Sequence, residues 1–583
     1  MALGPETTLV HVLDDKAEHH PEREALAFIP DIKDGGIRDR LTFGQLAERS
    51  RHLAARLVAA GFEPGQRALL LFPSGLDFAV AFFACSYARL IAVPAPLPER
   101  SRTSIQRLAG MMADAEPSVM LTVESSLDVI REWTDAHGYQ ALPRVTVSDA
   151  TVAPLAGFGP LEPPEPDDLA LLQYTSGSTS DPKGVMISHR NLTSNLDLIH
   201  SYLGREPEAR ICGWLPATHD MGLIGQLLYP LYTGGWLLML PPLEFVKRPY
   251  KWLELVDRHR AMYTAAPDFA YDLCVRMTNE EQAAKLDLSH WRAAFNGSEP
   301  IHARTLERFA DRFAPAGFRP PTFLPCYGLA EATLIVTGKP YGQPLERKVV
   351  DPEQIARGRF VPVAAGEAGR TLVSSGVILR DNVLIVDPET GVPLADGRIG
   401  EIWVTGEGVS RGYWRKEELN QATFNARTAD GRDGYLRTGD LGVRDGTQLY
   451  VTGRMKDVII SNGRNLHPHD LERALQEMAE DLIFGSSAVF ALDDDKVVAV
   501  QEVRHQEHND LARAATRIKQ ALAQQFGVGQ TSVVFVRPGA VRKTTSGKTR
   551  RSAMRQLFLE SGLRPIYMSL APDVSERLKE PRR

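Results

Sequence analysis

Cysteine is scarce in this sequence: four residues among 583, at Cys85, Cys212, Cys274 and Cys326, with no CxxC pair. Widely spaced single cysteines are typical of small buried residues in a reducing compartment. We therefore expect free thiols and a cytoplasmic location, with a disulfide or a cysteine metal site as the less favoured alternative.

Two further absences narrow the class of protein. The N-terminus, Met1–Glu6, has neither a basic segment nor a long apolar run, so a secretory signal is not expected. The apolar stretch Leu227–Leu243 is interrupted by prolines and glycines, which predicts buried strand and turn and no stable membrane insertion. A net charge of -6 gives no reason to expect nucleic-acid binding.

The length and the periodicity predict an α/β protein with at least two domains, because 583 residues exceed what one core supports. Short apolar runs such as Ala68–Phe72 alternate with helical patterns such as Asp77–Arg89 and Ala303–Phe313. Such alternation favours parallel sheets covered by helices.

The pattern changes after residue 400. The sequence first has a glycine-rich region of antiparallel character, Gly400–Tyr450. Around Gly453–Asp457 the alternation of strand and helix begins again, with a predicted strand, Val458–Ser461, and a predicted helix, Pro468–Met478. The last stretch, about 130 residues, is enough for a small α+β domain.

A loop rich in glycine and hydroxyl groups, Tyr174–Gly184, lies between the predicted strands Leu169–Tyr174 and Val185–Ser188. Its backbone N–H groups and hydroxyls can form an anion-binding concavity, to which Lys183 adds a charge. The loop is not a Walker A sequence. From these residues alone, phosphate binding and a flexible linker are equally good interpretations.

Five more short strings combine residues suited to nucleotide chemistry. A tyrosine can stack on a purine, a carboxylate can hold Mg²⁺ or accept ribose hydroxyls, and a lysine can neutralise phosphate. Each string also has an ordinary structural interpretation, as a His–Asp pair, a β-turn, a buried Tyr with a surface Glu, an Asp turn or a solvated basic face. The strings are Trp214–Gly222, Phe295–Pro300, Cys326–Glu331, Tyr435–Asp440 and Lys543–Lys548.

The loop Tyr174–Gly184 resembles the phosphate loop of the adenylate-forming superfamily (acyl-CoA synthetases, luciferases and peptide-synthetase adenylation domains), and the other strings follow in that family's order. The resemblance implies ATP and Mg²⁺ as cofactors. It implies catalytic roles for Lys548, between the substrate carboxylate and the α-phosphate, for His219 as a positioning residue, and for Glu331 as the Mg²⁺ ligand. The implied nucleotide-binding residues are Thr175, Ser176, Gly177, Ser178, Thr179, Lys183, Asn296, Gly297, Ser298, Glu299, Tyr327, Gly328, Asp440 and Arg454.

The same resemblance implies a division of the chain. Residues 1–453 would form a large adenylation domain of mixed sheets, helices and a distorted β-barrel. Residues 454–457 would be a hinge with Lys456 as its pivot, and residues 458–583 a mobile lid that carries Lys548. In similar enzymes this lid rotates between the two half-reactions.

Two features resemble the fatty acyl-AMP ligase branch. The 69 residues from Glu331 to Gly400 suggest an insertion in 338–370, which in that branch is thought to restrain the lid and disfavour CoA; a tolerated surface loop is the alternative. The strings Ala266–Cys274 and Asn462–Glu472 also resemble that branch. Departures from the common residues are Asp268 in place of Asn, His467 in place of Tyr, and Arg542 in place of Pro.

The resemblance therefore implies activation of a fatty acid as acyl-adenylate, followed by transfer to an acyl carrier protein or to a polyketide or peptide synthase carrier domain. No Asp-Ser-Leu carrier string follows Lys548, so we expect a stand-alone ligase. The basic stretch Arg537–Arg555 could meet an acidic carrier. Alternatives are an acyl-CoA synthetase, a non-catalytic nucleotide-binding homologue, and an amino-acid adenylation domain, for which Asp268 would be the candidate ammonium partner.

Overall fold

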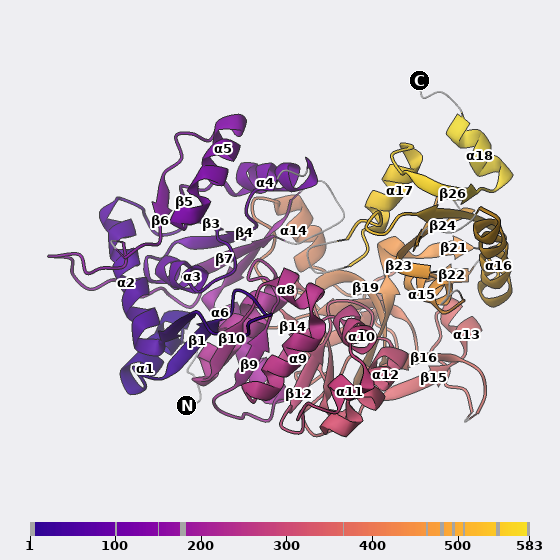
Figure 1. Ribbon diagram of the computed structural model, residues 1–583, viewed down its shortest axis with the longest axis horizontal. Coiled ribbons are helices and arrows are strands. Elements are labelled where there is room, and N and C mark those ends of the chain that lie inside the picture. The colour runs from indigo at the N-terminus through magenta and orange to yellow at the C-terminus, as the bar shows by residue number, and fades with distance from the viewer. Residues whose placement is uncertain are drawn as a thin grey trace.

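The structure is a computed structural model, which describes residues 6–99, 102–149, 151–174, 182–364, 366–461, 464–478, 483–492, 496–504, 508–543 and 548–579. Two large sheets with flanking helices form most of the structure up to residue 338 (Figure 1). The predicted α/β class with large N-terminal sheets and a small C-terminal α+β region is confirmed.

The larger sheet has eight strands in the order β14-β13-β12-β11-β9-β10-β1-β2. Its inner pairs are parallel, and only the two edge pairs, β13–β14 and β1–β2, are antiparallel. The strands are β1 (Glu24–Phe28), β2 (Asp39–Thr42), β9 (Arg210–Gly213), β10 (Trp236–Met239), β11 (Tyr263–Ala266), β12 (Ala293–Asn296), β13 (Phe323–Gly328) and β14 (Ile335–Gly338).

The second sheet has six strands in the order β6-β5-β3-β4-β7-β8, with only β7–β8 antiparallel. The strands are β3 (Arg67–Leu71), β4 (Ile91–Ala95), β5 (Val119–Thr122), β6 (Arg144–Thr146), β7 (Leu169–Tyr174) and β8 (Gly184–Ser188). The helices that accompany the two sheets are α1 (Leu9–His19), α2 (Phe43–Ala59), α3 (Asp77–Tyr87), α4 (Arg102–Ala115), α5 (Leu127–His137), α6 (His189–Tyr202), α7 (Tyr229–Thr233), α8 (Pro242–Lys247), α9 (Pro249–Arg258), α10 (Asp268–Met277), α11 (Glu280–Ala283) and α12 (Ala303–Phe313).

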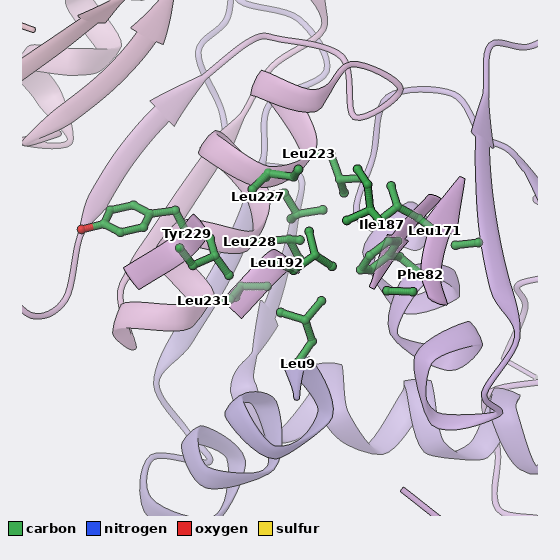
Figure 2. Packing of buried hydrophobic residues seen from close by; sticks show 14 of the residues in the cluster. Leu9, Phe82, Leu171, Ile187, Leu192, Leu223, Leu227, Leu228, Tyr229 and Leu231 are labelled. Atoms are coloured by element: carbon green, nitrogen blue, oxygen red, sulfur yellow. The ribbon is translucent and has the colours of Figure 1, made fainter. Parts of the chain in front are cut away.

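The prediction for Leu227–Leu243 was partly wrong. A π-helix, Met221–Leu228, runs directly into α7, and only the later segment forms a turn and strand β10. Figure 2 shows leucines of this helical stretch packed with Leu192 of α6 and with Leu171 and Ile187 of the second sheet. A continuous apolar run does not distinguish a buried strand from a buried helix, which explains the error.

The next segment contains two smaller antiparallel sheets. One has four strands, β17 (Val383–Val386), β18 (Gly400–Val404), β19 (Leu436–Asp445) and β20 (Gln448–Arg454). The other pairs β15 (Arg347–Val350) with β16 (Arg370–Val373), and helices α13 (Pro352–Ala356) and α14 (Glu417–Phe424) belong to the same segment. This confirms the antiparallel character predicted for Gly400–Tyr450, whereas closure into a barrel stays a prediction.

The C-terminal elements, orange to yellow in Figure 1, lie at one end of the molecule. They form a four-stranded mixed sheet, β23-β24-β25-β26, and a short pair, β21–β22. The elements are β21 (Ile459–Ser461), β22 (Arg464–Leu466), α15 (Pro468–Met478), β23 (Ile483–Ala491), β24 (Lys496–Val503), α16 (His508–Phe526), β25 (Gln530–Val536), α17 (Arg551–Leu559), β26 (Pro565–Ser569) and α18 (Pro572–Lys579). None of the described helices has the length and apolar character needed to cross a bilayer.

Candidate active site

A cavity of about 1850 Å³ is lined both by the large N-terminal part and by residues that follow Arg454. It contains most of the predicted site residues whose structure is described. These are Lys183, His219, Ser298, Glu299, Tyr327, Gly328, Glu331, Asp440, Arg454, Lys456 and Lys548. The structure therefore brings together residues that lie up to 365 positions apart between Lys183 and Lys548.

Other predicted site residues either lie outside the described residues or do not line the cavity. Thr175, Ser176, Gly177, Ser178 and Thr179 lie outside the described residues. Asn296 and Gly297 do not line the cavity. The Asn296 amide is buried and donates to Asp268, and a Cβ on Gly297 would lie 2.8 Å from the Cys326 sulfur.

Asn296 and Gly297 lie behind the cavity wall and shape the turn that follows β12. The Asn296 amide orients the Asp268 carboxylate, and the missing Cβ at Gly297 lets β12 and β13 end close together. Both residues support the turn expected beside adenine without reaching the cavity themselves.

Asp440 is held between a tyrosine and an arginine. The Tyr327 hydroxyl donates to Asp440 Oδ2 at 3.0 Å, and Arg454 Nε donates to Oδ1 at 2.9 Å. Asp440 and Arg454 are register partners in strands β19 and β20, so the backbone itself brings them together. The neighbouring carboxylate of Asp440 raises the pKa of Arg454. The group can accept ribose hydroxyls from a fixed position next to the Tyr327 ring.

Glu331 lies where β13 ends, in a short 3-10 helix. Its Oε1 accepts a hydrogen bond from the Tyr413 hydroxyl at 2.8 Å, and the Lys183 ammonium lies 5.1 Å from the Tyr413 ring centre. The Glu331 carboxylate thus lies in the cavity wall near the Lys183 ammonium. Such an oxygen ligand fits Mg²⁺, which proteins commonly bind through one carboxylate and substrate phosphates.

His219 and Asp220 form a close pair at the start of the π-helix. Their Nδ1 and Oδ1 atoms are 2.7 Å apart, and the Met221 backbone N–H donates to Asp220 Oδ1 at 2.7 Å. A Cβ at Gly222 would lie 2.2 Å from the Pro216 carbonyl oxygen, so only glycine permits this sharp turn. Burial would raise the pKa of Asp220, but the adjacent His219 and Lys548 hold it below its ordinary value.

Lys548 is half-buried in the cavity, from the segment that precedes α17. Burial lowers the pKa of its ammonium, and the carboxylates of Asp220, Asp440 and Glu299 oppose that shift. These three carboxylates belong to three separate parts of the large N-terminal region. Lys548 therefore lies between the part of the cavity that contains His219 and Asp220 and the part that contains Asp440.

A second pair of carboxylates lines the cavity. Asp268 is buried and accepts hydrogen bonds from the Asn296 amide at 2.9 Å and from the His302 backbone at 3.3 Å. Glu299 accepts the Phe269 backbone N–H at 2.7 Å. Burial raises the pKa of Asp268 to about 7, and burial together with Asp268 raises the pKa of Glu299 to about 7.

An arginine links the C-terminal elements to the segment after β20. Arg551 donates two hydrogen bonds to the Glu472 carboxylate, at 2.8 and 2.7 Å, and one to Asp457 at 2.9 Å. Lys456 lies beside this ion pair, within the short 3-10 helix Met455–Asp457. The Arg551 contacts fix Asp457 to α15 and α17.

The candidate insertion 338–370 contacts the C-terminal elements. Arg370 donates to His469 Nε2 at 3.1 Å and lies 3.0 Å from Asp470 Oδ1. Glu353, in α13, lies 3.8 Å from an Arg464 nitrogen. These contacts join the segment to α15 and β22, and the insertion itself stays a prediction.

Three cavity residues carried no signal strong enough to be predicted from the sequence. Asp220 was visible only as a neighbour of His219, and Tyr413 and Arg107 lie outside every recognised string. Their roles depend on contacts across the fold, such as the one between Tyr413 and Glu331.

Comparison with known proteins identifies the family of the chain. The family described as AMP-binding enzyme matches residues 13–414, and the family described as Disco-interacting protein 2-like, AMP domain matches residues 456–567. The chain is 36% identical over 573 residues to the medium-chain-fatty-acid–[acyl-carrier-protein] ligase JamA of Moorena producens, covering 96% of each. It is also 36% identical over 576 residues to a 4-hydroxyphenylalkanoate adenylyltransferase of Mycobacterium marinum, covering 96% of this chain and 92% of that protein.

A solved structure is similar along nearly the full length. The crystal structure of fatty acid AMP ligase from Legionella pneumophila superimposes with a TM-score of 0.75 at 35% identity, covering 97% of this chain and 98% of the other. The chain belongs to the AMP-binding superfamily, in its fatty acid AMP ligase branch.

Proposed function

We propose that this protein joins a fatty acid to AMP at the expense of ATP and then transfers the acyl group to the phosphopantetheine thiol of an acyl carrier protein. The observation that carries the proposal is the position of Lys548, in a cavity that also contains the Tyr327–Asp440–Arg454 group and Glu331. The names of the relatives support the same substrates.

In the first half-reaction, a carboxylate oxygen of the fatty acid attacks the α-phosphorus of ATP. The bond from that phosphorus to the bridging oxygen breaks, and pyrophosphate leaves with the electron pair. Both reactants are anions, so a cation between them lowers the barrier most. Lys548 supplies that charge, and Asp440 with Tyr327 orients the nucleoside.

Glu331 would hold Mg²⁺, which when bound supplies charge neutralisation to the phosphates. Lys183 contributes a second positive charge on the same side of the cavity. In the second half-reaction, the thiol sulfur attacks the acyl carbon, AMP departs, and the thiol proton is released to solvent.

The contacts from Arg370 and Glu353 to the C-terminal elements support a carrier protein as acceptor over free CoA. A segment that restrains the C-terminal part limits the positions that this part can take relative to the large N-terminal part. It thereby limits the ways in which a thiol can reach the acyl-adenylate. The alternative, an acyl-CoA synthetase, predicts rapid acyl-CoA formation from preformed acyl-adenylate.

The buried Asp268 argues against an amino-acid substrate. Its Oδ1 already accepts from Asn296 and from the His302 backbone, and burial raises the pKa of this carboxyl to about 7. Because Oδ1 is already used by donors of the protein itself, less of this carboxyl group is left for a substrate ammonium group.

ATP–pyrophosphate exchange across fatty acids of graded length, with 4-hydroxyphenylalkanoic acids included, tests the first half-reaction. Lys548→Ala is expected to lower the exchange rate by about 100-fold or more. The matched control is Lys285→Ala, which removes an exposed lysine paired with Glu281. An unchanged exchange rate in Lys548→Ala would refute the mechanism.

The second half-reaction is tested by offering preformed acyl-adenylate to a phosphopantetheinylated carrier protein and, separately, to CoA. We expect acyl transfer to the carrier and little acyl-CoA. Rapid acyl-CoA release would instead assign the protein to the acyl-CoA synthetases.

A further inference from the structure

Arg107 lies on the face of α4 that packs against the end of the phosphate loop. A Cβ placed on Gly110 would lie 3.1 Å from the Pro182 ring. Residues three apart in a helix share a face, so Arg107 is directed to the same side as Gly110. Arg107 also lines the same cavity as Lys183.

Arg550 reaches this cavity from the C-terminal part of the chain. It precedes the first turn of α17 and lies two residues after Lys548. Figure 1 shows α4 and α17 on the parts of the molecule that face each other. The buried Nε of Arg550 has no hydrogen-bond partner among the described residues.

Arg107 and Arg550 line the same cavity. Burial, followed by the positive charge of Arg550, lowers the pKa of Arg107. Within the described ranges neither side chain forms an ion pair with a carboxylate. Two partly buried like charges without a counterion are unfavourable unless an anion lies between them. Guanidinium groups bind phosphate oxygens in a bidentate manner, which suits a polyphosphate.

We propose that Arg107 and Arg550 form a polyphosphate clamp, which binds the β- and γ-phosphates of ATP and the pyrophosphate that they become. This inference rests on the adenylation reaction proposed above. The position of Arg107 beside the end of the phosphate loop favours this ligand over the single phosphate of a carrier's phosphopantetheine. Because the two arginines belong to parts of the chain on either side of the hinge, withdrawal of Arg550 with Lys548 would leave half a clamp and release pyrophosphate.

The reverse reaction measures the binding of pyrophosphate by Arg107 and Arg550 separately from the acyl transfer. A pyrophosphate oxygen attacks the phosphorus of the acyl-adenylate, the bond from that phosphorus to the acyl oxygen breaks, and ATP and the fatty carboxylate form. The KM for pyrophosphate in this direction reports the clamp directly. Arg107→Gln and Arg550→Gln should each raise it by about tenfold or more, as expected for a lost charge-assisted hydrogen bond.

The controls remove the same charge from outside the cavity. Arg131→Gln changes an exposed arginine of α5, and Arg564→Gln changes an exposed arginine of the C-terminal part. Both should leave the KM for pyrophosphate unchanged. Arg107→Lys retains the charge and is expected to give an intermediate value. Circular dichroism of each variant checks that it folds.

Transfer of the acyl group from preformed acyl-adenylate to a carrier protein should be unaltered by Arg107→Gln. A variant that loses transfer while keeping its KM for pyrophosphate would overturn the clamp and assign Arg107 to the carrier's phosphate. An unchanged KM in both glutamine variants would also overturn it. If the unaltered protein forms no ATP from acyl-adenylate and pyrophosphate, the proposed adenylation itself fails.

Discussion

Replacing Asp268 with asparagine should remove one defined contribution to the pH dependence of the protein's stability. Burial raises the pKa of this carboxyl from 3.8 to about 7. Between these two values the folded protein retains a proton that the unfolded chain releases. The contribution of Asp268 to the free energy of unfolding therefore falls as the pH rises through this window, because the unfolded state binds fewer protons at this group. The buried histidines His189, His467 and His469, whose pKa burial lowers, contribute with the opposite sign.

The size of the effect follows from the two pKa values. Between about pH 5.5 and about pH 7.5, Asp268 alone should lower the free energy of unfolding by about 2 kcal/mol. Glu299, whose pKa burial also raises to about 7, adds a change of the same sign. The side-chain oxygen of the introduced asparagine can still accept hydrogen bonds from Asn296 and the His302 backbone, so Asp268→Asn removes the titration with little change in shape.

Urea unfolding followed by tryptophan fluorescence measures this change. The Trp214 ring lies 6.2 Å from Phe269, the neighbour of Asp268, and is one of the seven tryptophans that contribute to the signal. Asp128→Asn, at a fully exposed side chain, is the matched control. If Asp268→Asn shows the same pH slope as the unaltered protein, with the same dependence on urea, the reasoning is wrong.

Three other perturbations have defined outcomes. Asp440→Ala removes the acceptor held by Tyr327 and Arg454, and should raise the KM for ATP about tenfold in the exchange assay. Gly453→Ala would place a Cβ 2.1 Å from the buried His467 Nδ1, and should cost about 1–3 kcal/mol of stability, measured by urea unfolding. Arg551→Met leaves the buried Glu472 unpaired and should lower local stability by about 3–5 kcal/mol, measured by hydrogen exchange in α15 and α17; unchanged exchange would contradict this.

Local patterns were sufficient to predict many elements of the fold. Helices Ala303–Phe313 and Pro468–Met478 and strand Leu169–Tyr174 were predicted with the bounds observed, because each has a marked hydrophobic pattern and clear ends. The π-helix that runs into Leu227–Leu243 was missed because its residues are apolar on almost every side.

The candidate site was predictable only where residues lie in short strings. Glu331, Asp440 and Lys548 were found in this way, whereas Tyr413 was not, because its meeting with Glu331 spans 82 residues and depends on how β8 and the later loops pack. The burial that raises the pKa of Asp268 also arises from tertiary packing, which no local pattern records.

Two ion pairs described above lie at the two ends of the segment that connects the large and small parts of the chain. Asp440 fixes Arg454 on one side, and Arg551 fixes Asp457 on the other. If both ion pairs persist while the C-terminal part rotates, the rotation must occur about the backbone bonds of Met455 and Lys456. The stiffness of this connection is then set by Met455 and Lys456, which also line the cavity, so any rotation of the C-terminal part would change the cavity wall directly.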